Sequence, residues 1–296
     1  MNSAAPLAFP QSAVAFIDIL GFSKMVEGDA SLARPSFLPR IKEIIDSAIR
    51  EASSEPVALR NFSDCILLSC PYSAPSVVQL LLYTRRVQLL GMENGILFRG
   101  AVCHGRHYAD PNVIYSPGLV AAYNLERLAA RVPRVLVDSQ LLKLLELHAV
   151  QEPELATELE SVLAVDRDGQ AFVDYLRIDD EATLNRLGSR IDEMIEATDL
   201  HDSGNFEKYY WLCSYYNRRH RRVLDRLRAF RLPELEDYHV PATSRPQRLG
   251  SESSTDNTGT QAPAGKSGAS KSREPDDAES KSEDSSAAPA ATMRRS

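Results

Sequence analysis

The sequence predicts an α+β fold in which a mainly antiparallel sheet is covered by helices. Apolar, β-rich runs alternate with segments of helical periodicity, and one hairpin interrupts the alternation. Apolar residues make up 43% of the 296 residues, which is enough for a sizeable core. The predicted order is β-α-β-β-α-β-α-β and then a long helix, with the helices packed on one face of the sheet.

The first part of the chain supplies a strand, a helix and a hairpin. Residues 13–19, AVAFIDI, form an apolar run that predicts a buried strand. Apolar residues at positions 41, 44, 45, 48 and 49 have helical spacing and predict a helix over 39–51. Residues 57–69 are strand-like on both sides of a turn near 61–64, which predicts a hairpin.

The same patterns continue along the chain. Helices are predicted over 76–91 and 117–131, with a strand over 96–104 between them. Short strands are predicted at 135–138 and 171–176. A long helix over 206–230 has a broad aromatic face, expected to pack on the sheet domain or across a dimer. This face contains Tyr209, Tyr210, Trp211, Tyr215 and Tyr216.

Composition divides the chain into three parts. We expect one domain over residues 1–180 and a helical extension over 181–242. Residues 243–296 contain no Ile, no Val and no aromatic residue. Such a segment cannot bury enough apolar surface to offset the entropy of ordering it, so we expect a disordered tail.

The overall composition excludes several classes of protein. There are 41 acidic and 34 basic residues, and the net charge of −7 argues against a nucleic-acid binder. No apolar run reaches the roughly 18 residues of a membrane-spanning helix, and the N-terminus does not resemble a secretion signal. The four cysteines include no CxxC pair, which suits a reducing compartment and predicts a cytoplasmic location.

Two acidic residues interrupt apolar strands. Asp18 lies in AFIDILGFS and Asp64 lies in RNFSDCILLS. Two carboxylates on neighbouring strands would repel each other, and a divalent cation removes that repulsion. Mg²⁺ and Mn²⁺ prefer such oxygen ligands and leave positions for phosphate oxygens. The alternative is that Asp18 caps a helix and that Asp64 belongs only to a hairpin turn.

Four blocks in order resemble the class III nucleotidyl cyclase catalytic domain. FIDILGF (16–22) is similar to the strand that carries the first metal-binding aspartate of that family, and Asp64 is similar to the second. FRGAVCHG (98–105) and GLVAAYNLERLA (118–129) are similar to the next strand and helix. The resemblance covers about residues 13–180, and it is closest to the bacterial pyrimidine cyclases of Pycsar phage-defence systems.

The chain departs from the purine cyclases of the family at the positions that contact the nucleotide. Ser63 replaces the usual glycine before the second aspartate, and Arg60 replaces a lysine that helps to read the base. The positions of the acid that recognises adenine, the ribose-binding asparagine and the transition-state arginine align with Val113, Val120 and Asn124. These differences argue against purine recognition.

The resemblance implies a two-metal reaction at the first aspartate. Asp18, Asp64 and the carbonyl of Ile19 would hold two Mn²⁺ or Mg²⁺ ions. The N–H groups of Gly21, Phe22 and Ser23 would bind the phosphates of the substrate. No separate general base is needed if a metal ion activates the ribose hydroxyl.

The resemblance also implies a homodimer whose sites lie between the subunits. Arg60, Arg99 and Asn124 are candidates for contacts made by the partner, and Arg99 and Asn124 for a catalytic role. Arg60 could donate to a uracil carbonyl, bind phosphate or be a solvated hairpin residue. Phe16 lies on the same strand face as Asp18 and approaches the base or sugar, or belongs only to the core.

The function implied is conversion of UTP to 3′,5′-cyclic UMP and pyrophosphate, with the product activating a separate effector in antiviral defence. The alternatives are a cytidylate cyclase that makes cyclic CMP, a nucleotide-sensing module without turnover and a purine cyclase with an unusual pocket. Chance similarity in an unrelated α+β domain is the remaining alternative. No nucleic-acid or membrane partner is expected.

Overall fold

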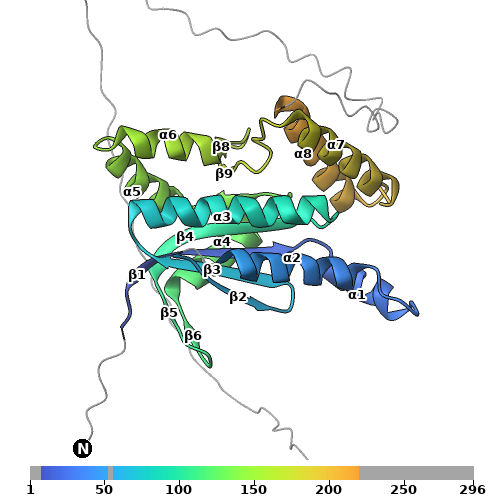
Figure 1. The fold of residues 1–296 in the computed structure, drawn as a ribbon, viewed down its shortest axis with the longest axis horizontal. Helices are drawn as coiled ribbons and strands as arrows, with labels where there is room; N and C mark the ends of the chain where they lie inside the picture. Colours follow the sequence, from blue (N-terminus) through green and yellow to red (C-terminus); the bar gives the residue numbers. More distant parts are fainter. Residues whose placement is uncertain (1–7, 53–55, 220–296) are drawn as a thin grey trace, which may run out of the picture. The chain divides into compact units, whose positions relative to one another are not determined.

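The computed structural model describes residues 8–52 and 56–219. Its centre is a seven-stranded sheet in the order β2-β3-β1-β4-β7-β9-β8 (Figure 1). Neighbouring strands are antiparallel except for β4 and β7, which are parallel. The sheet strands are β1 (Gln11–Ile19), β2 (Ala58–Phe62), β3 (Cys65–Pro71), β4 (Phe98–Arg106), β7 (Val135–Val137), β8 (Leu163–Val165) and β9 (Ala171–Val173).

Eight helices and a small hairpin surround this sheet in the described residues. The hairpin pairs β5 (Tyr108–Ala109) with β6 (Ile114–Tyr115). None of the described helices combines the length and the apolar character needed to cross a bilayer. The helices are α1 (Phe22–Ala30), α2 (Phe37–Ala52), α3 (Ala74–Glu93), α4 (Pro117–Ala129), α5 (Ser139–Ala149), α6 (Pro153–Val162), α7 (Glu181–Glu196) and α8 (Ser203–Arg219).

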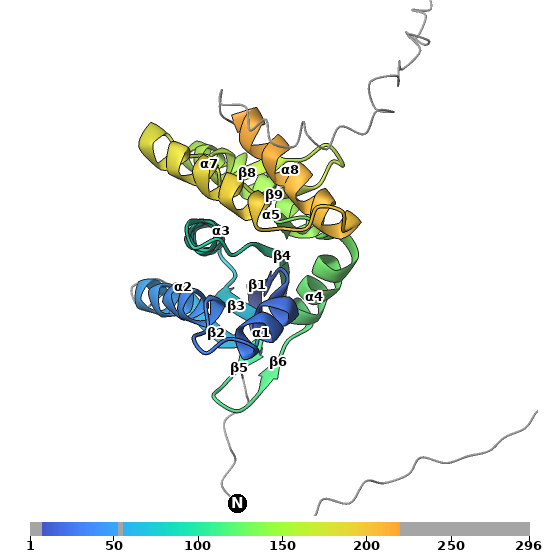
Figure 2. The same ribbon diagram turned by 90° about the vertical axis from the view of Figure 1, so that its right-hand side faces the viewer.

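Both faces of the sheet are covered, so the prediction that helices pack on one face is wrong. Ala15 and Ile17 of β1 belong to a core shared with α2 and α3, whereas Phe16 packs with Ala122 of α4. Figure 2 shows α2 and α3 on one side of β1 and α4 on the other. The physical reason is that alternate residues of β1 point to opposite faces, and both sets are apolar.

The predicted strands, hairpin and helices of the first 131 residues are confirmed, with small shifts at their ends. The sequence analysis did not predict α1, β5, β6, α5, α6 and β8, and it gave no bounds for α7. The last predicted strand ends at Val173. Asp174 follows that strand and turns to α8, where its carboxylate accepts a hydrogen bond from Tyr215 at 2.5 Å. Residues 220–230 of the predicted long helix and the tail over 243–296 lie outside the described residues.

Helix α8 packs on the sheet through aromatic side chains, as its predicted aromatic face required. Tyr215 lies against Phe172 of β9, with ring centroids 5.3 Å apart, and Trp211 lies 5.7 Å from the same ring. These residues share one buried cluster with Ala101 and Leu136 of the sheet. The helical extension therefore shares a hydrophobic core with the residues that precede it.

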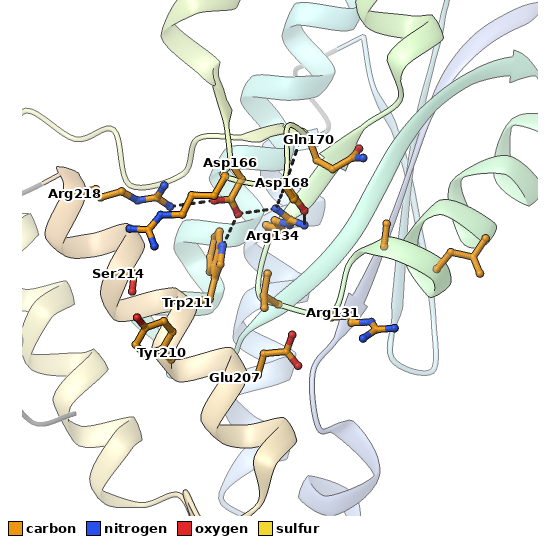
Figure 3. Close-up of a pocket in the computed structure, with 14 residues that line it drawn as sticks. Arg131, Arg134, Asp166, Asp168, Gln170, Glu207, Tyr210, Trp211, Ser214 and Arg218 are labelled. Atoms are coloured by element: carbon orange, nitrogen blue, oxygen red, sulfur yellow. Dashed lines mark hydrogen bonds and ion pairs between the residues drawn. The ribbon is translucent and has the colours of Figure 1, made fainter. Parts of the chain in front are cut away.

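The Asp166 carboxylate links α8 to Arg134 through hydrogen bonds (Figure 3). It accepts hydrogen bonds from the indole N–H of Trp211 at 2.5 Å and from Arg134 at 2.6 Å. Arg134 also pairs with Asp168 at 2.5 Å. Only 6% of the Asp166 side chain is exposed, against 49% for Asp168. Because Asp166 is buried and Asp168 is not, the two ion pairs of Arg134 should contribute very differently to stability.

We expect Asp166→Ala to lower the free energy of unfolding by about 3–5 kcal/mol, because it removes the buried ion-pair partner of Arg134 and the acceptor of the Trp211 indole. The matched control is Asp168→Ala, which removes the exposed partner of the same arginine and should cost at most about 1 kcal/mol. Chemical denaturation followed by Trp211 fluorescence measures both. Equal losses in the two variants would show that burial does not distinguish them.

Candidate active site

Asp18 lies at the end of β1, on the sheet face that carries Phe16. Its neighbours across the sheet are Cys65 on β3 and Arg99 on β4. The side chain is 14% exposed, although the strand residues around it are apolar. A carboxylate held this deeply requires cations or donors close by.

Asp64 is brought beside Asp18 by the β2–β3 hairpin. Phe62 pairs with Cys65, which leaves Ser63 and Asp64 as the two residues of the turn. Ser63 has a φ of 54°, a left-handed conformation that costs a non-glycine residue roughly 1–2 kcal/mol, and this explains why glycine suits the position. The backbone N–H of Ile19 donates to the Asp64 carbonyl at 3.1 Å and holds the turn against the end of β1.

The two carboxylates meet with one sulfur. An oxygen of Asp18, an oxygen of Asp64 and the Sγ of Cys65 all lie within 4.8 Å of one another. Burial first, and then the neighbouring carboxylates, raise the pKa of the Cys65 thiol to about 12. The two carboxylates offer oxygen ligands, which fit Mg²⁺ or Mn²⁺.

Arg99 is the positive charge that the structure places at this site. Its Nε lies 3.0 Å from Asp18 and 2.8 Å from the Oε1 of Glu126, a residue of α4 that is only 3% exposed. Burial raises the pKa of Asp18, Arg99 opposes that rise, and the nearby Asp64 adds to it. Burial likewise raises the pKa of Glu126 against the effect of Arg99. One arginine therefore does not fully compensate the carboxylates around it.

The chain turns sharply after Asp18 and opens α1. Gly21 has a φ of 81°, and nothing lies within 4 Å of where its side chain would begin. The Met25 N–H donates to the Gly21 carbonyl at 3.1 Å and forms the first turn of the helix. Phe22 and Ser23 lie in this first turn, where backbone N–H groups have no partner within the helix. Gly21, Phe22 and Ser23 therefore form the start of α1, directly after the end of β1.

Ile19 and Phe16 have core side chains. The Ile19 side chain is buried, so only its backbone faces the turn. Phe16 is also buried and meets Tyr123 of α4 edge to face, with ring centroids 5.6 Å apart. Its place two residues from Asp18 on the same face is as predicted, and its packing supports the core role.

Two residues that were assigned to the site lie apart from the carboxylates. Arg60 is half-buried on β2, near His107 and Asp110 of the β5–β6 region. Asn124 is exposed on α4, and the helical period turns it away from the sheet because Ala122 and Glu126 face the sheet. Arg99 was also expected to contact a partner, but it already binds the carboxylates of its own subunit.

Sequence reasoning missed Glu126 and Cys65 as members of the site. Glu126 follows Gly118 and Ala122 at intervals of four, and that spacing places it on the buried face of the helix. Cys65 directly follows Asp64, but its approach to Asp18 depends on the register of three strands. The helical spacing of Glu126 could have been recognised in the sequence, whereas the position of Cys65 could not.

We expect Asp18→Asn to raise the melting temperature of the metal-free protein at neutral pH by about 2–4 °C. A carboxyl whose pKa is raised by folding binds more protons in the folded state, so stability falls as pH rises above its ordinary pKa of 3.8. The neutral amide removes that loss. Thermal unfolding in EDTA between pH 4 and 8 measures it.

In thermal unfolding without EDTA, added Mn²⁺ should stabilise the wild-type protein and leave Asp18→Asn unchanged. Asp46→Asn is the control, because Asp46 forms only an exposed ion pair with Lys42 on α2. If Asp18→Asn is less stable than the wild type at pH 7, the ion pair with Arg99 stabilises the Asp18 carboxylate by more than its burial destabilises it.

No protein-family model matches the chain, and no curated protein sequence matches it. Among solved structures, the adenylyl cyclase CyaB from P. aeruginosa is similar at 12% identity, covering 57% of this chain and 95% of that one, with a TM-score of 0.35. A monomeric guanylyl cyclase domain from the fungus Blastocladiella emersonii is similar at 12% identity, covering 55% and 94%, with a TM-score of 0.38. A bacterial light-regulated adenylyl cyclase is similar at 11% identity, covering 64% and 59%, with a TM-score of 0.38.

Proposed function

We propose that this chain is a nucleotidyl cyclase that converts a nucleoside triphosphate to a 3′,5′-cyclic nucleotide and pyrophosphate. The observation that carries the proposal is the meeting of Asp18 and Asp64 directly before the Gly21 turn. That arrangement places two oxygen ligands for divalent cations beside free backbone N–H groups for phosphate. It gives a role to two carboxylates that lie close together at the end of β1.

The proposed reaction forms one bond and breaks one. The ribose 3′-oxygen attacks the α-phosphorus, its proton passes to solvent, and the bond to the pyrophosphate oxygen breaks. Asp18, Asp64 and the Ile19 carbonyl would hold two Mn²⁺ or Mg²⁺ ions, which would supply positive charge for activating the 3′-hydroxyl and for the leaving pyrophosphate. The N–H groups of the α1 turn orient the phosphates, and the Arg99 guanidinium adds positive charge beside them.

We infer a pyrimidine substrate, with UTP favoured over CTP. In the resembling family, the position of the base-reading lysine carries Arg60 here and the position of the adenine-recognising acid carries Val113. The position of the ribose-binding asparagine carries Val120, and the two valines are 51% and 60% exposed. Arg60 offers only hydrogen-bond donors, which suits the carbonyl oxygens of uracil. The role of a cyclic pyrimidine nucleotide in antiviral defence, acting on a separate effector, follows from the same resemblance.

We infer that the active form is a homodimer. The outer face of α4 and the adjacent β5–β6 hairpin expose large apolar side chains. These are Val113, Tyr115, Val120, Tyr123 and Leu128. An apolar surface of this kind favours association with another protein. Asn124 lies on that face, so it would reach the site of a second subunit and not its own.

A nucleotide sensor without turnover is the second candidate. Asn124 stands where the resembling enzymes have a transition-state arginine, and that replacement favours binding over catalysis. The intact pair of Asp18 and Asp64 opposes it. Turnover separates the two functions.

We expect purified protein with Mn²⁺ to convert UTP to cyclic UMP, with ATP and GTP giving at most traces. Mass analysis of the products from ATP, GTP, CTP and UTP in separate reactions measures this. Asp18→Ala and Asp64→Ala should each reduce the rate at least about 100-fold, because each removes a ligand of the metal ions. Asp46→Ala, on the surface of α2, is the control and should keep full activity.

A cyclic purine product would overturn the assignment of the base. Failure of every triphosphate to react, with metal-dependent nucleotide binding retained, would replace the cyclase by the sensor. Cyclic CMP as the main product would keep the reaction and correct the substrate.

We expect Val120→Asp to convert the homodimer to a monomer and to abolish turnover, because a charge on the apolar face of α4 opposes association. Analytical ultracentrifugation measures the oligomeric state. Leu147→Asp on α5 is the control, since Leu147 is 68% exposed on another helix. A Val120→Asp dimer with normal activity would place the interface elsewhere.

A further inference from the structure

A pocket of about 320 Å³ lies beside the turn that opens α1, between the β1–α1 turn, Leu97 and the α7–α8 connection. Its lining includes Gly21 and Lys24, the acidic Asp199 of the α7–α8 connection, and Lys208 and Tyr209 of α8. The helical extension therefore closes over the end of β1, a few residues from Asp18.

The Lys208 ammonium is the unusual group in this pocket. The side chain is half-buried on α8, and within residues 8–52 and 56–219 it makes no hydrogen bond or ion pair. Burial lowers its pKa first, and the nearby Arg99 lowers it further. Lys24 acts in the same direction, and Asp202 and Glu207 act in the opposite direction.

Two of the neighbouring charged groups, Arg99 and Asp202, already bind other groups. Arg99 binds Asp18 and Glu126. Asp202 accepts hydrogen bonds from the N–H groups of Gly204 and Asn205 at the start of α8, and it pairs with the exposed Lys24 at 3.5 Å. Lys208 is thus a partly desolvated cation beside two other cations. Such a group is costly without a counter-ion, and an anionic ligand would supply one.

The β1–α1 turn, which lines the same pocket as Lys208, is suited to a phosphate chain. Gly21 leaves the backbone open to a ligand, because nothing lies within 4 Å of its missing side chain. The first turn of α1 adds the positive end of the helix dipole to the three cations. The Tyr209 hydroxyl is held by the Thr198 hydroxyl at 3.2 Å, which fixes the wall that carries Lys208.

We propose that Lys208, together with Lys24, binds the terminal phosphates of the nucleoside triphosphate and the pyrophosphate that it releases. This inference rests on the proposed function, because it assigns the outer end of the same substrate. It makes α8 part of the active site of its own subunit. The ligand class is a polyphosphate of at least two phosphoryl groups, reaching from the Asp18–Asp64 pair past the Gly21 turn.

The test uses inorganic tripolyphosphate as the probe and full-length protein with Mn²⁺. Isothermal titration calorimetry should show binding to the wild type and about 10–100-fold weaker binding to Lys208→Met, which keeps the aliphatic stem and removes the charge. Lys208→Arg should retain most of the affinity. Lys143→Met, an exposed lysine on α5, removes one positive charge elsewhere and should bind as the wild type does.

Lys24→Met provides a second variant whose folding is not in question, because the Lys24 side chain is 75% exposed. Lys24→Met should also bind tripolyphosphate more weakly than the wild type does. Absence of tripolyphosphate binding to the wild type, or equal binding by Lys208→Met, would overturn the inference.

Kinetics separate this inference from the proposed function. If a triphosphate is turned over, Lys208→Met should raise KM for it about tenfold or more, whereas Lys143→Met should not. If no triphosphate reacts but the probe still distinguishes Lys208→Met from Lys143→Met, the cyclase assignment fails and the polyphosphate site stands. If a triphosphate is turned over and Lys208→Met leaves its KM unchanged, the cyclase assignment stands and the polyphosphate site fails.

Discussion

The burial of the Asp18 carboxylate at the end of β1 constrains everything near it. The strand must be apolar to form the centre of the sheet, so a charge at its end is deprived of water. Arg99 on the neighbouring strand binds both Asp18 and Glu126 of α4. The nearby Asp64 raises the pKa of Asp18. Three carboxylates, those of Asp18, Asp64 and Glu126, therefore lie around Arg99. Such an excess of negative charge favours the binding of divalent cations.

The extension beyond residue 180 has two physical roles. Its aromatic residues cover the part of the sheet that α4 leaves open, and the Asp166 carboxylate holds Trp211 in place. The same helix carries Lys208 to the pocket beside Gly21. A group that contacts phosphate must be positioned to within a fraction of an ångström, and an aromatic core provides that rigidity better than a loop does.

The sequence was most informative where one residue or one period decides the structure. Asp18 and Asp64 stood out because a charge is rare in a buried strand, and the strands and helices around them followed from periodicity. Contacts between distant segments were beyond reach. No local pattern shows that Cys65 meets Asp18, that Arg99 binds its own subunit's carboxylates or that Lys208 lies beside the Gly21 turn, because each depends on strand register or on how α8 packs. Helices α5 and α6 were missed although the Asp138 N-cap of α5 and Pro153 at the start of α6 are signals that the sequence carries.

The packing of Tyr215 and Tyr216 against the sheet also bears on how the chain acquires its structure during synthesis. Both are almost fully buried, and they come from α8, long after β1 to β4 have left the ribosome. One face of the nascent sheet therefore presents Ala101, Leu136 and Phe172 to solvent until the last helix arrives. This interval is when the chain is most exposed to aggregation and most in need of chaperones.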